Sequence, residues 1–150
     1  MITHVDELAD NVGRELGVTD WVLVDQERID RFADATGDHQ WIHVDRERAA
    51  AGPFGTTIAH GYLTLSMLPI FLEPILAFDG IAMQLNYGLE SVRFPHPVPV
   101  DSRIRARVSV DSFDETERGI RVVLACLIEI EGVDKPACVA RPVALLIRTR

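Results

Sequence analysis

Asp38 and His43 are the two residues of this chain whose types and spacing are best suited to chemistry. They lie in the segment Gly37-Asp38-His39-Gln40-Trp41-Ile42-His43, where a carboxylate and an imidazole can both point at one small molecule, such as a water. Such a pair can carry general acid–base catalysis near neutral pH. The same residue types are common in turns and helix caps, so the spacing alone leaves a purely structural loop open.

Metal ligation is another interpretation of this segment. His43 and Asp45 both carry groups that bind cations, but the sequence offers no clear third ligand beside them. The two cysteines, Cys126 and Cys138, lack the spacing of a zinc or redox motif and lie within apolar runs. We therefore expect no metal and predict two reduced, buried thiols.

A second candidate feature is Ala59-His60-Gly61, which precedes a long apolar segment. A glycine at a helix start lets a ligand approach the backbone, and the free N–H there can stabilise a carbonyl oxygen that gains negative charge. An ordinary tight turn explains the same residues. His60 by itself is more typical of a structural histidine than of a catalyst.

Arginines are candidates for holding an anionic ligand. Arg93 precedes a proline-rich, rigid connection at 94–99 and can meet a phosphate, although a lone arginine is more typical of a surface ion pair. Arg103, Arg105 and Arg107 alternate with apolar residues. They predict the solvated face of a strand, with binding of an anionic cofactor tail as the alternative.

The first half of the chain is predicted to be mainly helical. Apolar spacing indicates an N-terminal helix over 5–16 and a buried helical segment over 62–78, with a kink or break at Pro69 or Pro74. Asp25 and Asp45 are predicted N-caps of helices over about 26–35 and 46–51. Gly37 ends the first of these, so 38–43 is predicted to be a loop.

The second half has the two-residue period of strands. Strands are predicted over 81–87, 103–110, 120–130 and 137–148, after an early one at 21–24, with a hairpin link at 131–135. Residues 120–130 are apolar on both faces, which predicts a strand covered on both sides. The order of elements predicts an α+β fold in which an antiparallel sheet wraps a buried helix.

Composition restricts the class of protein. A chain of 150 residues with 47% hydrophobic residues predicts one domain over 1–150, with 1–18 as an N-terminal helical extension. The net charge of −8 argues against nucleic acid or an anionic membrane as a partner. The N-terminus lacks the pattern of a signal peptide, and no apolar run is long enough to span a bilayer, so we expect a cytoplasmic protein.

Taken in order, these segments resemble the MaoC-like dehydratase family, which includes the (R)-specific enoyl-CoA hydratases. The family signature Gly-Asp-x-Asn-Pro-hydrophobic-His-x-Asp is similar to the nine residues at 37–45, except that Gln40 and Trp41 replace Asn-Pro. That variant resembles the branch of nodulation-protein-N-like and mycobacterial hydratases. The segments 58–63 and 86–100 also resemble the family, and the resemblance covers roughly 20–148.

The resemblance implies a hot-dog fold, a sheet wrapped around a long central helix, and a homodimer. It implies (R)-specific hydration of trans-2-enoyl-CoA, or the reverse dehydration of 3-hydroxyacyl-CoA, with no cofactor. Asp38 and His43 would activate a water, and the Gly61 N–H would polarise the thioester carbonyl. Trp41, Tyr62 and Arg93 are the expected substrate-binding residues.

Two other functions are compatible with the same fold. A hot-dog thioesterase would release free thiol, but such enzymes commonly rely on one carboxylate, and His43 would then be superfluous. A non-catalytic acyl-CoA-binding protein is the other alternative, and the altered positions Gln40 and Trp41 motivate it. The acyl chain length and the choice between CoA and carrier-protein thioesters stay open.

Overall fold

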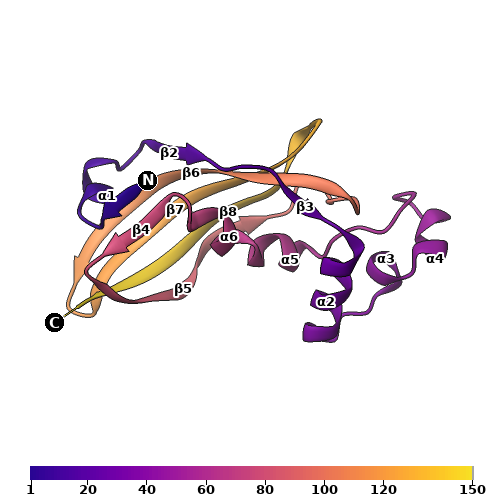
Figure 1. The fold of residues 1–150 in the computed structure, drawn as a ribbon, viewed down its shortest axis with the longest axis horizontal. Coiled ribbons are helices and arrows are strands. Elements are labelled where there is room, and N and C mark those ends of the chain that lie inside the picture. The colour runs from indigo at the N-terminus through magenta and orange to yellow at the C-terminus, as the bar shows by residue number, and fades with distance from the viewer. Residues whose placement is uncertain (150) are drawn as a thin grey trace.

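The computed structural model describes residues 1–149 and has a six-stranded antiparallel sheet with helices at one end (Figure 1). The main path through the sheet is β2-β6-β7-β8-β5, and β3 also pairs with β6. The strands of this sheet are β2 (Glu15–Val18), β3 (Val22–Val24), β5 (Ile81–Arg93), β6 (Ser102–Thr116), β7 (Gly119–Ile130) and β8 (Val133–Arg148).

The long strands place one apolar face against the core, because side chains alternate along a strand. Ile104, Ala106, Val108 and Val110 of β6 are all buried, as their alternation with arginines predicts. β7 buries its even-numbered side chains and Val123, whereas Ala125 and Leu127 on the other face are only partly buried. The expectation that both faces of β7 are covered is therefore met only in part.

The predicted break in the apolar segment near Pro69 is confirmed, but the helical part is shorter than expected. Residues 62–78 form α5 (Gly61–Ser66), α6 (Leu68–Leu72) and then a strand, β4 (Leu76–Asp79). Pro69 lies in the first turn of α6, where a missing N–H costs nothing. Leu63, Met67, Leu68 and Phe71 pack into the core, but Tyr62 and Ile70 are exposed. Among residues 1–149, no helix combines the length and apolar character needed to cross a bilayer.

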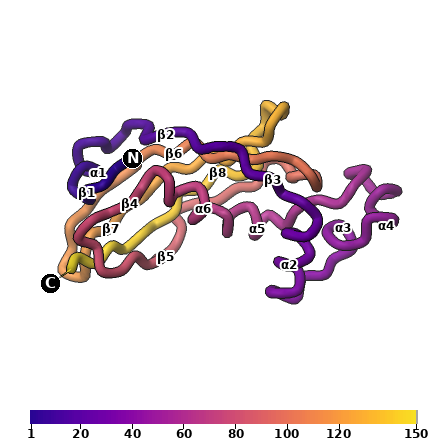
Figure 2. Tube along the Cα trace, viewed as in Figure 1, coloured from indigo at the N-terminus to yellow at the C-terminus, as the bar shows by residue number. Residues whose placement is uncertain are grey.

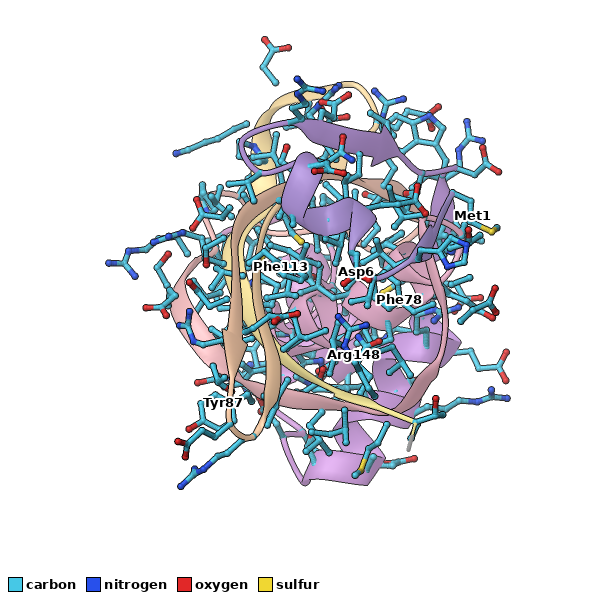
Figure 3. All side chains as sticks on the ribbon, turned by 90° about the vertical axis from the view of Figure 1, so that its left-hand side faces the viewer. Met1, Asp6, Phe78, Tyr87, Phe113 and Arg148 are labelled. Atoms are coloured by element: carbon cyan, nitrogen blue, oxygen red, sulfur yellow. The ribbon has the colours of Figure 1, made fainter. Side chains whose placement is uncertain are left out.

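The predicted helix over 5–16, and with it the helical extension over 1–18, is wrong. Only α1 (Glu7–Asp10) is helical, between β1 (Ile2–His4) and β2. β1 pairs in parallel with β4, and β2 pairs with β6, so the segment runs along the sheet (Figure 2). Arg148 of β8 forms an ion pair with Asp6 at 2.6 Å, and both residues are labelled in Figure 3. The first residues are thus part of the sheet architecture.

Three helices gather beyond the end of the sheet: α2 (Gln26–Thr36), α3 (Trp41–Val44) and α4 (Arg46–Ala50) (Figure 1). Asp25 and Asp45 cap α2 and α4 as predicted, each accepting a hydrogen bond from an N–H three residues later. Gly37 ends α2 in the left-handed conformation, with φ 81°. The prediction of a loop over 38–43 needs correction, because His43 lies on the short helix α3.

Both cysteines are buried and reduced, as predicted. Burial raises the pKa of Cys126 to about 12 and that of Cys138 to about 11. Thiols with such pKa values are unreactive near neutral pH, since the thiolate is the nucleophile. They belong to the core rather than to a site.

Candidate active site

Asp38 lies on the loop that leaves α2 at Gly37. The Gln40 backbone N–H donates to its Oδ1 at 3.3 Å, an Asx turn of the kind that aspartate forms readily. Its side chain is 51% exposed, so the carboxylate can meet a ligand arriving from solvent. The loop therefore orients the carboxylate through Oδ1 and leaves Oδ2 available to a ligand.

His43 is held in one tautomer by a buried hydrogen bond. Its Nδ1 lies 2.7 Å from the Ile58 carbonyl oxygen. A carbonyl can only accept, so Nδ1 carries the hydrogen and the Nε2 of the neutral ring keeps its lone pair. Burial lowers the pKa of His43, and the neighbouring His60 ring acts in the same direction. His43 is thus a neutral imidazole at physiological pH, with Nε2 able to accept a proton.

Two polar residues from other elements support the backbone at His43. Gln26, on the first turn of α2, donates from Nε2 to the His43 carbonyl oxygen at 2.7 Å. Thr57 donates to the Gln26 Oε1 at 2.6 Å, and both of these side chains are buried. The sequence analysis missed both residues. The signal available was weak: a Gln and a Thr beside apolar neighbours.

His60 is the main residue of the site whose place sequence reasoning did not find. Its ring stacks on the His43 ring, with centroids 3.8 Å apart and planes 23° apart. Its Nε2 lies 2.9 Å from the Asp38 carbonyl oxygen. Within residues 1–149 its buried Nδ1 has no hydrogen-bond partner, so only one of its two ring nitrogens is paired.

A carboxylate oxygen of Asp38 and one ring nitrogen each of His43 and His60 lie within 4.8 Å of one another. One water can bridge two acceptors at that separation, because each hydrogen bond spans about 2.8 Å. The set does not suit a metal ion. The lone pairs of the two stacked imidazoles lie in nearly parallel planes, with ring centroids 3.8 Å apart, so one ion cannot lie well in the plane of both rings, and His60 Nε2 already faces a carbonyl oxygen.

Gly61 is the first residue of α5, beside this cluster. Within residues 1–149 no acceptor is paired with its backbone N–H, which leaves it free to bind a carbonyl oxygen of a ligand. The Phe94 ring covers its Cα so closely that an added Cβ would lie 3.1 Å from two ring carbons. Glycine is needed here for close approach rather than for an unusual φ.

A short extended segment joins the acid–base pair to Gly61. The Ile58 N–H donates to the Ile42 carbonyl oxygen at 3.0 Å, and the Ala59 N–H donates to the Val98 carbonyl oxygen at 2.8 Å. Residues 57–59 are therefore held between α3 on one side and the proline-rich connection at 94–99 on the other. This explains why three segments distant in sequence meet at one place.

The structure spreads the three expected substrate-binding residues around this cluster. Trp41 begins α3, and its ring packs against Gly52 with the Arg48 guanidinium 4.5 Å from the ring centroid. Tyr62 is 69% exposed and meets Phe94 edge-on. Arg93 is exposed at the end of β5 and bonds to the Val92 carbonyl oxygen. Their role in binding stays a prediction.

The arginines of β6 form a solvated, charge-paired face, the first of the two interpretations offered for them. Arg105 reaches Glu129 at 2.7 Å, and Arg107 reaches Glu15 at 2.7 Å. Arg103 pairs with Glu131 in the same way. Since each cation has a carboxylate partner, the face is poorly suited to an anionic cofactor tail.

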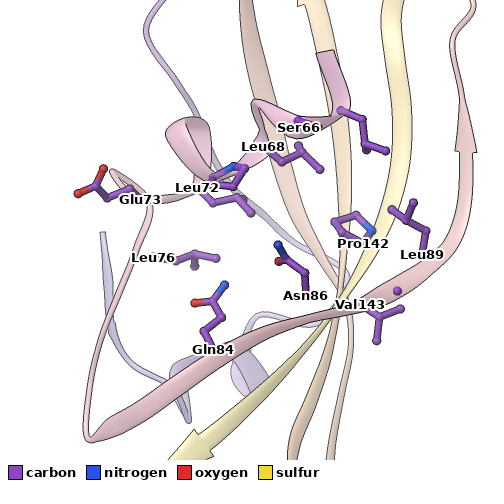
Figure 4. A pocket seen from close by; sticks show the side chains of 13 residues that line it. Ser66, Leu68, Leu72, Glu73, Leu76, Gln84, Asn86, Leu89, Pro142 and Val143 are labelled. Carbon is purple, nitrogen blue, oxygen red and sulfur yellow. The ribbon is translucent and has the colours of Figure 1, made fainter. Parts of the chain in front are cut away.

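A groove of about 680 Å³ runs between the α5–α6 segment and the strands β5 and β8 (Figure 4). It begins at Leu65 and Ser66, one turn beyond Gly61 on α5, and continues past Leu68 and Leu72. Its walls are mainly apolar, with Gln84 and Asn86 of β5 on the opposite side. The groove is thus separate from the acid–base cluster but starts close to the Gly61 amide.

A comparison with known families finds the MaoC like domain over residues 7–131, most of the chain. The chain belongs to the MaoC-like family. It is 51% identical to the 3-hydroxyacyl-thioester dehydratase Z of Mycobacterium tuberculosis over 93% of each chain. It is 43% identical to the nodulation protein N of Rhizobium leguminosarum bv. viciae, over 95% of this chain and 92% of that protein. The predicted family and branch are confirmed.

Solved structures confirm the predicted hot-dog fold. The unliganded (R)-hydratase from Pseudomonas aeruginosa superposes with a TM-score of 0.73 over 92% of this chain and 83% of its own, at 20% identity. At that identity the likeness concerns the fold alone. In this chain the helical segment of the fold is divided into α5 and α6.

Proposed function

We propose that this protein is an (R)-specific hydro-lyase that interconverts trans-2-enoyl-CoA and (3R)-3-hydroxyacyl-CoA. The observation that carries the proposal is the meeting of three groups. The Asp38 carboxylate and the His43 imidazole lie close enough to share one water, beside the free N–H of Gly61. The name of the dehydratase that is 51% identical supports a hydroxyacyl thioester as substrate.

Hydration follows from the geometry of these groups. His43 Nε2 accepts a proton from the water as its oxygen bonds to C3 of the enoyl thioester. The C2=C3 electron pair shifts to form an enolate, whose negative oxygen receives the hydrogen bond of the Gly61 N–H. Asp38 orients the water, and a proton returned to C2 completes the net addition of water. Dehydration runs through the same states in reverse.

The groove along α5 and α6 is suited to the acyl chain. It starts one turn from the Gly61 amide, where the thioester carbonyl would lie, and Leu65, Leu68 and Leu72 give it an apolar wall. The exposed Arg93 and Tyr62, on the solvent side of the cluster, are suited to the phosphate-bearing CoA portion. Replacing Leu72 by Trp would shorten the groove and shift preference toward shorter acyl chains.

A homodimer in the cytoplasm is the assembly proposed for this enzyme. β5 is a 13-residue edge strand whose outer edge pairs with no strand within residues 1–149. Met83, Leu85, Tyr87 and Leu89 on it are exposed apolar residues. An edge of this length normally needs cover. Sedimentation of the wild type and of Leu85→Lys, expected as dimer and monomer, tests this.

The test of function mixes purified protein with crotonyl-CoA and longer enoyl-CoA esters and follows the loss of enoyl absorbance. Asp38→Asn and His43→Gln are each expected to lower kcat by about 10²- to 10⁴-fold. Asp34→Asn and His39→Gln are matched controls. These two exposed residues form their own Asp–His pair near the same loop, with Asp34 Oδ1 2.8 Å from His39 Nε2, and neither belongs to the cluster. Full activity in either cluster variant would refute the assignment.

The thioesterase alternative is tested in the same cuvette with a thiol reagent. Hydration leaves the thioester intact, so no CoA thiol is expected while the enoyl absorbance falls. Thiol release that matches loss of substrate would instead indicate hydrolysis. Acyl-CoA binding without either reaction would identify the non-catalytic binding protein.

A further inference from the structure

His60 has no step in the proposed reaction, yet it is the most constrained side chain of the site. It is 2% exposed and lies immediately before Gly61, as the N-cap residue of α5. Its ring contacts both members of the acid–base pair, one by a hydrogen bond and one by stacking. Within residues 1–149 its Nδ1 has no hydrogen-bond partner, and an unpaired buried nitrogen costs free energy, so we looked to its neighbours for a compensating role.

The hydrogen bond fixes the backbone of the loop that carries Asp38. The partner of His60 Nε2 is a carbonyl oxygen, so this nitrogen must donate, at 2.9 Å. The Asp38 carboxylate is itself 4.0 Å from the same nitrogen and stays free for a water. His60 thus anchors the main chain of Asp38 without occupying its side chain.

The stack fixes the plane of the His43 ring. The two imidazoles lie 3.8 Å apart and nearly parallel, and the Phe32 ring contacts the other member, His60, at 4.9 Å and 57°. His60 is therefore packed between two rings and has little freedom to rotate about its own bonds, so the face that it presents to His43 is fixed. The Ile58 hydrogen bond sets one edge of His43, and the stack sets its face.

We propose that His60 is a positioning residue for the hydration step. It holds the Asp38 main chain and the His43 ring in the arrangement in which both reach one water, and it leads directly into the residue that supplies the Gly61 N–H. One side chain thereby ties together the three groups of the reaction. The inference rests on the proposed hydratase function and adds a residue to its machinery.

A second consequence concerns protonation of the pair. The groups of the cluster that can carry charge are Asp38, His43 and His60, while α2 presents the neutral amide of Gln26 to the His43 backbone and the Asp30 carboxylate bonds to that amide at 2.8 Å. Two stacked imidazoles cannot both be cationic without strong repulsion. Burial is the main cause of the lowered pKa of His43, and the neighbouring His60 ring lowers it further, so both favour the neutral His43 that a base requires.

Two variants separate these effects. His60→Phe keeps a flat ring against His43 but loses the donor to Asp38. His60→Gln keeps an N–H donor of similar reach but loses the ring. Misplacement of a catalytic group by a fraction of an ångström to one ångström lowers rates by up to about 10²-fold. We expect kcat to fall by about 10- to 100-fold in His60→Phe with KM changed by less than about threefold, and by less in His60→Gln.

The pH dependence of kcat/KM distinguishes a positioning role from a merely structural one, because loss of stability alone would not shift it. In both variants the acid limb of kcat/KM is expected to shift to higher pH, because His43 is then more easily protonated. Val122→Ala, a buried substitution on β7 away from the site, is the control for lost stability and should leave both kcat and the limb unchanged. Unchanged kcat and acid limb in both His60 variants would overturn the proposal.

The wild type offers a test that does not depend on folding of a variant. Nitrogen NMR of labelled imidazoles is expected to show hydrogen on Nε2 of His60 and on Nδ1 of neutral His43. The opposite tautomer at His60 would remove the bond to Asp38 and overturn the inference. An inactive wild type with the expected tautomers would instead count against the hydratase function alone.

Discussion

Gly61 offers a sharp test of the oxyanion assignment through the substitution Gly61→Ala. Its φ is not in the left-handed region, so alanine fits the backbone and only space opposes it. The new Cβ would lie 3.1 Å from two carbons of Phe94, a few tenths of an ångström closer than ordinary contact. Overpacking of this kind costs about 1–3 kcal/mol, and we expect the lower end because Phe94 is 39% exposed and can yield in part.

The effect on activity is expected to exceed the effect on stability. Loss of one oxyanion donor lowers kcat by about 10²- to 10³-fold, and here the N–H is displaced rather than removed. We therefore predict a fall in kcat/KM of about 10- to 100-fold. The assay is enoyl-CoA hydration, with urea unfolding measured on the same samples.

The double variant Gly61→Ala with Phe94→Ala tests the cause. It removes the ring that the methyl group would meet, so most of the lost activity should return, relative to Phe94→Ala alone. Gly17→Ala is the matched control, since its added Cβ would make only ordinary contact with Ile75 at 3.8 Å. Full activity of Gly61→Ala, or failure of the double variant to recover, would refute this account of the glycine.

Three further outcomes follow from the buried groups of the site and core. Burial lowers the pKa of His43 below its ordinary value of 6.5. As pH falls below about 6.5, the imidazole is therefore protonated in the unfolded chain before it is protonated in the folded one, and the free energy of unfolding should drop. Urea midpoints measured from pH 7.5 to 5.5 should show a smaller drop in His43→Gln than in the wild type. Thr57→Val leaves the buried Gln26 acceptor unpaired and should cost about 1–3 kcal/mol in urea unfolding, and a loss below about 0.3 kcal/mol would contradict the role of that bond. Cys126 and Cys138, with pKa values of about 12 and 11, should resist iodoacetamide at pH 8 until the protein unfolds, and rapid alkylation of native protein would show that they are accessible.

The parts of the fold that were predictable are those set by local signals. α2 lies between Asp25 and Gly37, a side-chain cap and a left-handed stop that are both visible in the sequence. β6 shows strict alternation because one of its faces meets the core and the other meets water. In each case residues close in the sequence determine the conformation, so the element can be predicted from the sequence.

The errors arise where distant segments decide. Val5, Leu8 and Val12 have helical spacing, but Gly13 adopts a φ of 80° and the residues after it pair with β6. Residues 76–79 continue an apolar run that suits a helix, yet they pair with β1 at the start of the chain. Strand pairing between remote segments leaves no local trace in a helical spacing pattern.

The candidate site divides in the same way. The Asp38–His43 spacing and the glycine before an apolar helix were recognisable as chemistry-bearing patterns. His60 was not, because a single histidine has no spacing partner, and its contacts with Asp38 and His43 come from tertiary packing. Gln26 and Thr57 act through a buried chain of hydrogen bonds that joins α2 to a segment 31 residues away.

The departure Gln40-Trp41 from the usual Asn-Pro has a physical compensation in this structure. Trp41 is the first residue of α3, the position where proline is favoured, and Gln40 is its N-cap and makes no capping bond. Without proline, the start of α3 is held by packing instead. The Trp41 ring lies against Gly52, which has no side chain in the way, and the Arg48 guanidinium lies over the ring. Arg48 lies on α4 and Gly52 lies in the turn after it. The N-cap of α4 is Asp45, which is also the last residue of the motif at 37–45. The motif in this chain is therefore held by a tertiary contact in place of a rigid ring, and the orientation of α3, which carries His43, depends on the packing of Trp41.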